Sequence, residues 1–167
     1  MQRKIINRLV LCALFLSLTI IFTVFISFPI GSQGGYINLG DSMIVIASTI
    51  LGPFYGAFVG GVGSAIADLI LAPQYAIFTF IIKGLEGLII GLLVKNLHIK
   101  AKVILASICG LSIMVIGYHI VGIFMYESLI LPFTDTLFNF IQMVASLFIS
   151  QFVLFALNKT IKKKLWS

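Results

Sequence analysis

Charged side chains are scarce in this sequence of 167 residues. Only 10% of its residues are charged and 60% are hydrophobic, whereas an ordinary soluble domain has about 25% charged residues. A soluble chain of this length cannot hide so much apolar surface, because its outer shell must be polar. The scarcity of charge therefore excludes a water-soluble domain and predicts an integral membrane protein.

Cysteines and catalytic motifs are also scarce. Cys12 and Cys109 lie in apolar runs without metal-ligand spacing, and we expect both to be buried thiols. The sequence has no H-E-x-x-H zinc helix, no G-x-S-x-G nucleophile elbow and no G-x-x-x-x-G-K-[ST] phosphate loop. We therefore predict no enzyme activity, no metal and no cofactor. Any ATP-driven step would need partner ATPases.

The basic residues report membrane orientation. Ten of the eleven fall into three clusters, at 3–8, 95–102 and 159–164. They form no basic face interleaved with exposed aromatic residues, so we expect no nucleic-acid partner. The first apolar run, 9–28, is too long for a signal peptide and no small-x-small cleavage site follows it. We predict that it remains as the first membrane span.

The apolar runs predict an all-α fold of six transmembrane helices. Pro53 divides the long stretch 42–72, because proline disfavours helix in the residue before it. Six crossings place the three basic clusters in the cytoplasm with both termini, whereas five would put the basic tail outside. We predict one domain, 1–167, in the cell membrane. Its helices are expected near residues 9–28, 42–55, 56–71, 74–94, 102–125 and 136–157, with outer loops at 29–41, 72–75 and 126–135.

Small residues recur at helix-packing spacing. Gly52, Gly56 and Gly60 are four apart, as are Gly87 and Gly91, and such spacing lets helix backbones approach closely in lipid. For these glycines we favour packing within the chain over contact with another subunit. A weaker pair on the first helix, Ala13 and Ser17, leaves both interpretations open.

Three ionisable side chains lie within the predicted spans: Asp68, Lys83 and Glu86. Each costs about 2.5–3.5 kcal/mol on insertion scales, so such groups usually face the bundle interior and serve function. Lys83 and Glu86 are three residues apart and share a helical face. They form either a self-neutralising ion pair or part of a polar binding site.

Polar stripes on the last two helices favour a binding site. One stripe joins His119 to Tyr126, and another joins Asn139, Gln142 and Ser146. Together with the fourth helix they predict a pocket near the outer face, covered by the glycine-rich segment 30–41. Asp41 and Ser42 also suit a helix N-cap, and for Asp41 both this structural role and contact with a ligand stay open. The residues predicted to bind substrate are Tyr36, Asn38, Lys83, Glu86, His119, Asn139 and Gln142.

Four motifs in order carry a family resemblance: Gly35-Tyr36-Ile37-Asn38-Leu39-Gly40-Asp41, then Leu51-Gly52-Pro53, Ala67-Asp68-Leu69 and Ile82-Lys83-Gly84-Leu85-Glu86-Gly87. The chain resembles the substrate-binding (S) components of energy-coupling-factor (ECF) vitamin transporters. It is most similar to the branch that handles pyridoxine or the hydroxymethylpyrimidine precursor of thiamine.

The resemblance implies a six-helix protein that captures a small vitamin beneath the loop after its first helix. It also implies association with a transmembrane coupling subunit and two cytoplasmic ATPases, and toppling in the membrane to deliver the occluded vitamin. Family members carry an A-x-x-x-A motif that faces the coupling subunit. Ala13 matches its first position, and Ser17 replaces the second alanine.

Two other classes of function compete with vitamin capture. A membrane scaffold of the cell-shape type has similar length and basic termini, but does not require polar stripes or a glycine-rich outer loop. A small ion-coupled transporter could use Asp68 or Glu86 to carry a proton. The sequence shows no inverted repeat, which disfavours that class.

Overall fold

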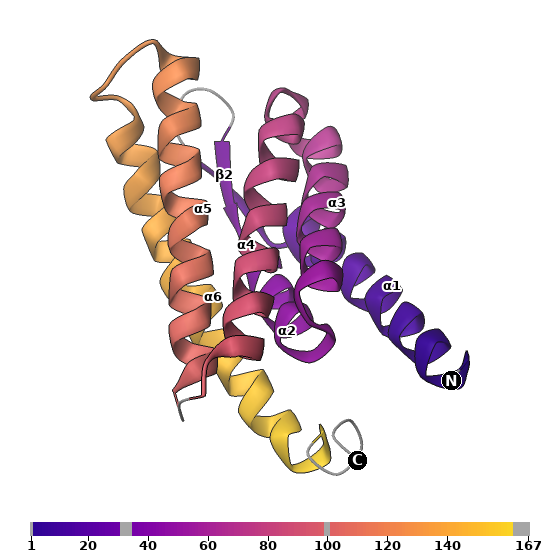
Figure 1. Cartoon of the computed structure of the whole chain (residues 1–167). Coiled ribbons are helices and arrows are strands. Elements are labelled where there is room, and N and C mark those ends of the chain that lie inside the picture. The colour runs from indigo at the N-terminus through magenta and orange to yellow at the C-terminus, as the bar shows by residue number, and fades with distance from the viewer. Residues whose placement is uncertain (1, 31–34, 99–100, 162–167) are drawn as a thin grey trace.

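The computed structural model describes residues 2–30, 35–98 and 101–161 as a helical bundle (Figure 1). A two-stranded antiparallel hairpin, β1 (Ser27–Ile30) and β2 (Gly35–Asn38), joins the first two helices. A short 3-10 helix, η1 (Pro73–Tyr75), precedes the fourth. The predicted all-α membrane fold is confirmed. Its helices are α1 (Gln2–Phe25), α2 (Gly40–Leu51), α3 (Pro53–Leu71), α4 (Ala76–Asn96), α5 (Lys102–Tyr126) and α6 (Pro132–Ile161).

The helix of the second membrane crossing is shorter than the helices of the others. Five segments of 19 to 26 residues are long and apolar enough to span a membrane, whereas α2 has 12 residues. At 1.5 Å per residue α2 covers about 18 Å, which is less than the roughly 30 Å of hydrocarbon. The strand β2 leads into α2 (Figure 1) and adds about 13 Å. Strand and helix together therefore make this crossing.

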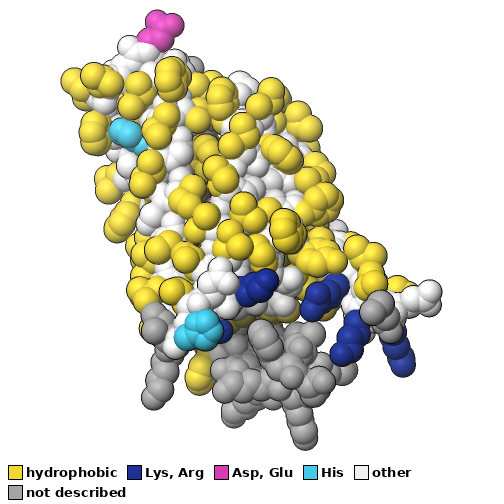
Figure 2. Space-filling model, in the orientation of Figure 1, with side chains coloured by type: hydrophobic (Ala, Val, Ile, Leu, Met, Phe, Trp, Pro, Cys, Tyr) yellow, Lys and Arg dark blue, Asp and Glu magenta, His cyan; other side chains and the backbone are white. Residues whose placement is uncertain are grey.

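The two ends of the bundle differ in charge. The start of α1 and the end of α6 lie at the same end (Figure 1). On the face shown in Figure 2, Lys and Arg side chains gather at that end, an acidic group lies at the opposite end, and hydrophobic side chains cover the flank between them. This distribution agrees with cytoplasmic termini, and we call the opposite end the outer end. Lys100 and Lys162 to Lys164 lie outside the described residues.

Helix boundaries differ from the predicted ones where glycine or proline sets the geometry. The second helix ends at Leu51 rather than 55, because Gly52 adopts a φ of 92° that other residues rarely take. Pro53 then begins α3, since its fixed φ and missing N–H suit a first helical position. The first helix also begins earlier than predicted, at Gln2, and ends at Phe25, where the chain turns into β1.

Helix α2 occupies the centre of the bundle. Ten of its twelve residues are buried, and it contacts α1, α3, α4 and α6. Beside it, α3 and α4 pack through their glycines. A Cβ atom on Gly87 would overlap the backbone of Gly56, and one on Gly60 would overlap the carbonyl of Lys83. The predicted internal packing of these glycines is confirmed, except that Gly52 forms the turn between α2 and α3.

Small residues elsewhere face outward. Ala13 and Ser17 are both exposed, and the Ser17 hydroxyl donates to the Ala13 carbonyl at 2.9 Å. This pair therefore takes no part in packing within the described bundle. Cys12 is buried as expected, but the expectation for Cys109 is wrong, because its thiol lies on the surface of α5.

The glycine contact between α3 and α4 is testable by adding one methyl group. Gly87→Ala should lower the free energy of unfolding by about 1–3 kcal/mol, since overpacking forces the backbones apart. Gly84→Ala is the matched control on the same helix, because its added Cβ would meet ordinary contacts of 3.7 and 3.8 Å. Thermal unfolding in detergent compares the two variants. Equal melting temperatures would contradict the close contact.

Candidate substrate-binding site

A cavity of about 50 Å³ lies inside the outer half of the bundle. Its wall is built from α1, the hairpin, α3, η1, α4, α5 and α6. Every one of these elements except β1 contributes at least one polar side chain to the wall. The polar side chains are Thr23, Tyr36, Asn38, Ser64, Asp68, Tyr75, Thr79, Lys83, Tyr118, Asp135, Asn139 and Gln142.

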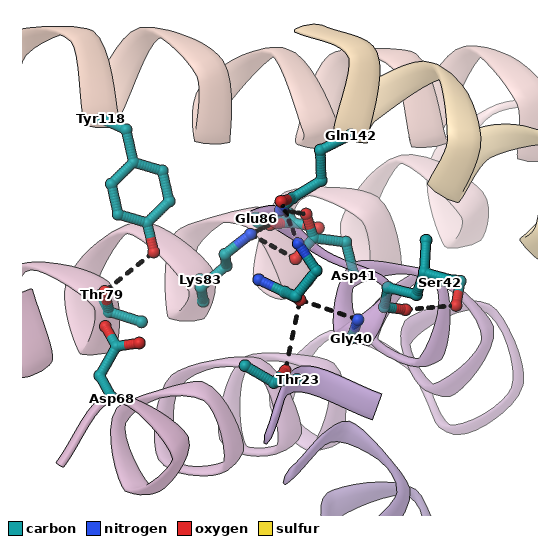
Figure 3. Close-up of polar contacts among 12 residues, drawn as sticks. Thr23, Gly40, Asp41, Ser42, Asp68, Thr79, Lys83, Glu86, Tyr118 and Gln142 are labelled. Atoms are coloured by element: carbon teal, nitrogen blue, oxygen red, sulfur yellow. Dashed lines mark hydrogen bonds and ion pairs between the residues drawn. The ribbon is translucent and has the colours of Figure 1, made fainter. Parts of the chain in front are cut away.

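The base of the cavity is a buried ion-pair network around Lys83 (Figure 3). Lys83 is 2% exposed, and its ammonium group donates to Asp41 and lies 3.4 Å from a Glu86 oxygen. A buried ammonium without counter-ions would be strongly destabilising. The two carboxylates therefore fix the position of Lys83 and balance its charge.

Gln142 connects this network to the hairpin. Its amide nitrogen donates to the second Asp41 oxygen at 2.6 Å, and its amide oxygen accepts the backbone N–H of Asn38 at 2.7 Å. Asp41 therefore holds side chains from α4 and α6 at once, directly below the end of β2. The network ties the helices and the hairpin into one arrangement.

The hairpin forms one side of the cavity and is held by side-chain hydrogen bonds. The Tyr36 hydroxyl donates to Asp68 on α3. The Asn38 side-chain oxygen accepts from the Thr23 hydroxyl at 3.3 Å and from the N–H of Gly40 at 2.8 Å (Figure 3). Irregular backbone at membrane depth is tolerated where protein surrounds it, and these bonds supply partners for it.

On the side of the cavity formed by α4, α5 and α6, Tyr118 lines the wall and Tyr126 bonds to a wall residue. Tyr118 shares a hydrogen bond of 2.8 Å with Thr79 (Figure 3), and its ring centre lies 5.5 Å from the Lys83 ammonium. Tyr126 donates to Asp135 at the start of α6. The cavity thus combines flat aromatic surface with carboxylate and amide groups, which suits a small polar ring.

The structure brings most of the predicted site residues to one wall. Tyr36, Asn38, Lys83, Asn139 and Gln142 line the cavity. Glu86 is fully buried and contacts Lys83, outside the cavity lining. His119 is also absent from the lining, since its ring pairs with the Thr136 hydroxyl at 2.7 Å and packs edge-on against Phe133.

Several residues in the cavity wall or directly bonded to it were not among the predicted site residues. The interpretation of Asp41 as an N-cap is wrong, because α2 has no side-chain cap and Asp41 binds Lys83 instead. Asp68 lines the cavity, whereas the sequence suggested a role for it only as a proton carrier in the competing ion-coupled class. Tyr118 directly precedes the stripe that begins at His119, and its place beside Thr79 depends on how α5 rotates against α4.

Asp41 is expected to stabilise the site more than Glu86 does. Asp41→Asn should lower the free energy of unfolding by about 3–5 kcal/mol, because it removes a carboxylate bonded to both Lys83 and Gln142. Glu86→Gln is the matched control and should cost less. Its ion pair is longer, at 3.4 Å, and neither Glu86 oxygen has a hydrogen-bond partner among the described residues. Equal losses in thermal unfolding would contradict this ranking.

Comparison with known proteins gives the family. The family model for the S component of the ECF-type riboflavin transporter matches residues 4–160. A 128-residue stretch is 34% identical to the thiamine precursor transporter HmpT of Lactococcus lactis subsp. cremoris, covering 75% of this chain and 73% of the relative. An uncharacterised Pyrococcus woesei protein is 41% identical over 104 residues, 62% of this chain and 70% of its own length. The chain therefore belongs to the S components of ECF-type transporters, which are membrane proteins.

Proposed function

We propose that this S component captures a small one-ring vitamin or vitamin precursor at the outer face of the cell membrane. The observation that carries the proposal is the cavity beneath the hairpin, into which five separately predicted polar residues project: Tyr36, Asn38, Lys83, Asn139 and Gln142. No catalytic group is needed for this function, because the site only has to bind and release. Pyridoxine and hydroxymethylpyrimidine are the two candidate compounds.

The size of the cavity supports a one-ring substrate. Its volume of about 50 Å³ admits roughly four water molecules, which occupy on the order of 120 Å³ as liquid. That is close to the bulk of one substituted six-membered ring. The three fused rings and sugar-alcohol chain of riboflavin are far larger. The cavity therefore favours the kind of cargo named for HmpT over the one named for the matching family model.

Delivery in this proposal requires partners. Two cytoplasmic ATPases supply ATP hydrolysis and act through a transmembrane coupling subunit, and the S component topples to bring the bound substrate to the cytoplasmic side. The exposed pair Ala13 and Ser17 on α1 is the proposed docking face. The Ser17 hydroxyl is already bonded to the Ala13 carbonyl, so the face offers small groups against which a partner helix can pack closely.

Titration calorimetry on the purified chain in detergent tests the cargo. We expect nanomolar-to-micromolar binding of pyridoxine or hydroxymethylpyrimidine and no measurable heat with riboflavin, because the cavity accommodates one ring. A panel of other B vitamins serves as the control for selectivity. If riboflavin binds tightly and neither one-ring compound does, the proposed cargo is wrong.

The docking face is tested separately from the cavity. Ala13→Leu should abolish co-purification with the coupling subunit and ATPases while leaving ligand affinity unchanged, because the added bulk blocks close helix contact. Ala156→Leu, at an exposed position of α6, is the matched control and should keep the complex. An intact complex with Ala13→Leu would remove this face from the proposal.

A further inference from the structure

The connection between α5 and α6 carries an exposed apolar segment, residues 129–133, which we call the apolar tip. Its sequence is Leu129-Ile130-Leu131-Pro132-Phe133, and no charged residue lies between Glu127 and Asp135. The four side chains other than that of Pro132 are between 55% and 78% exposed. A contiguous apolar patch of this kind marks a contact with an apolar partner.

The backbone of the apolar tip already has hydrogen-bond partners. The Ser128 hydroxyl accepts the N–H of Ile130 at 3.2 Å and the N–H of Leu131 at 3.3 Å. Pro132 has no N–H to satisfy, and the N–H of Phe133 donates to the Ile130 carbonyl at 3.1 Å. In lipid each backbone donor must be paired within the protein. Residues 130–133 meet this condition without water.

Helix length places the apolar tip inside the bilayer. Helix α5 begins at Lys102, in the second basic cluster, and has 25 residues, which span about 37 Å at 1.5 Å per residue. The bilayer is about 40–45 Å thick with its headgroup layers. A helix that starts in the cytoplasmic headgroup layer therefore ends within the outer one, where the connection to α6 lies (Figure 1). Tilting of the helix would bring the tip deeper.

The apolar tip is continuous with the apolar surface of the helices on either side. Phe124 near the end of α5 is 76% exposed, and Leu137 near the start of α6 is 61% exposed. The nearby carboxylate of Asp135 is turned inward, where it accepts from Tyr126 and lines the cavity. The surface that faces lipid along the bundle therefore extends over the tip.

The apolar tip is also joined to the cavity wall. Gly122 lines the cavity, and a Cβ atom added to it would meet the Pro132 ring at 3.0 Å. The tip thus packs directly behind the wall that α5 and α6 form. Whatever holds the tip in place also holds this wall.

We propose that residues 129–133 insert into the outer leaflet of the membrane and anchor the outer ends of α5 and α6 to lipid. The partner is the acyl-chain region just below the phospholipid headgroups. The Ser128 hydroxyl makes the insertion feasible, because it pairs two backbone donors that water would otherwise have to solvate. The anchor is independent of the proposed cargo.

Spin-label accessibility in phosphatidylcholine vesicles tests the insertion. The full chain carries alanine in place of Cys12 and Cys109, and the label is attached through Ile130→Cys. Glu127→Cys is the matched control, since this exposed charged residue on the same connection is expected in water. We expect the ratio of collisions with oxygen, which concentrates in lipid, to collisions with a water-soluble nickel chelate to be several-fold higher for the label at position 130.

Removal of the Ser128 hydroxyl tests why the tip can insert. Ser128→Ala should raise the nickel accessibility of the label at position 130 several-fold, because the unpaired N–H groups move toward water. Thr134→Val is the matched control and should leave it unchanged. Its hydroxyl only donates to the Leu131 carbonyl, at 2.9 Å, and pairs no N–H of the tip.

Three outcomes would overturn the lipid anchor. Equal nickel accessibility at positions 127 and 130 would place the tip in water. Low accessibility to both reagents, or spin–spin broadening between labelled chains, would show that protein covers the tip. An unchanged label environment in Ser128→Ala would remove the role of the hydroxyl. None of these measurements uses a ligand, so they leave the proposed function untouched.

Discussion

The arrangement of this protein depends on the need to balance one buried ammonium group. Lys83 sits in the middle of α4 with 2% of its surface exposed, and an unpaired charge there would be strongly destabilising. Its two carboxylate partners come from different places in the chain, Glu86 one turn away and Asp41 at the start of α2. Gln142 then joins Asp41 from α6. Compensating the charge of Lys83 thus fixes α2, α4 and α6 relative to one another.

The same constraint explains how a strand can form part of a membrane crossing. Helix α2 is too short to cross alone, so the chain above it must be irregular. The Gln142 side chain accepts the Asn38 N–H, and the Asn38 side chain accepts the N–H of Gly40. These bonds replace the helical ladder at the junction of β2 and α2, where water could not serve.

Sequence patterns predict the parts of this molecule that depend on local spacing. The apolar runs and the basic clusters give the crossings, and the four-residue glycine spacing gives the contact between α3 and α4. Polar residues in apolar spans, such as Lys83 and Gln142, are also easy to recognise, because the residues around them in the sequence are apolar. Each of these signals lies within one helix, so it can be read without knowing how the helices pack.

The features that escaped prediction depend on contacts between distant segments. Asp41 has a local explanation as a cap, and its true partner Lys83 is 42 residues away. His119 is a residue type that often occurs in binding sites, yet its ring is hydrogen-bonded to the Thr136 hydroxyl on the next helix. The hairpin strands have four residues each, too few to show an alternating pattern. Only the packed bundle decides these cases.

The cavity wall combines a base of paired polar groups with Asn139 on α6, which has no side-chain hydrogen bond among the described residues, and this difference has an evolutionary consequence. The base residues hold helices together, so substitutions among them threaten folding before they change recognition. Asn139 has no such duty within the described bundle, and exchanging it changes the cavity wall while the ion pairs remain. The lining of the cavity can therefore change at this position without loss of the contacts that hold the helices together. Retuning such a protein by design would begin on that face of α6.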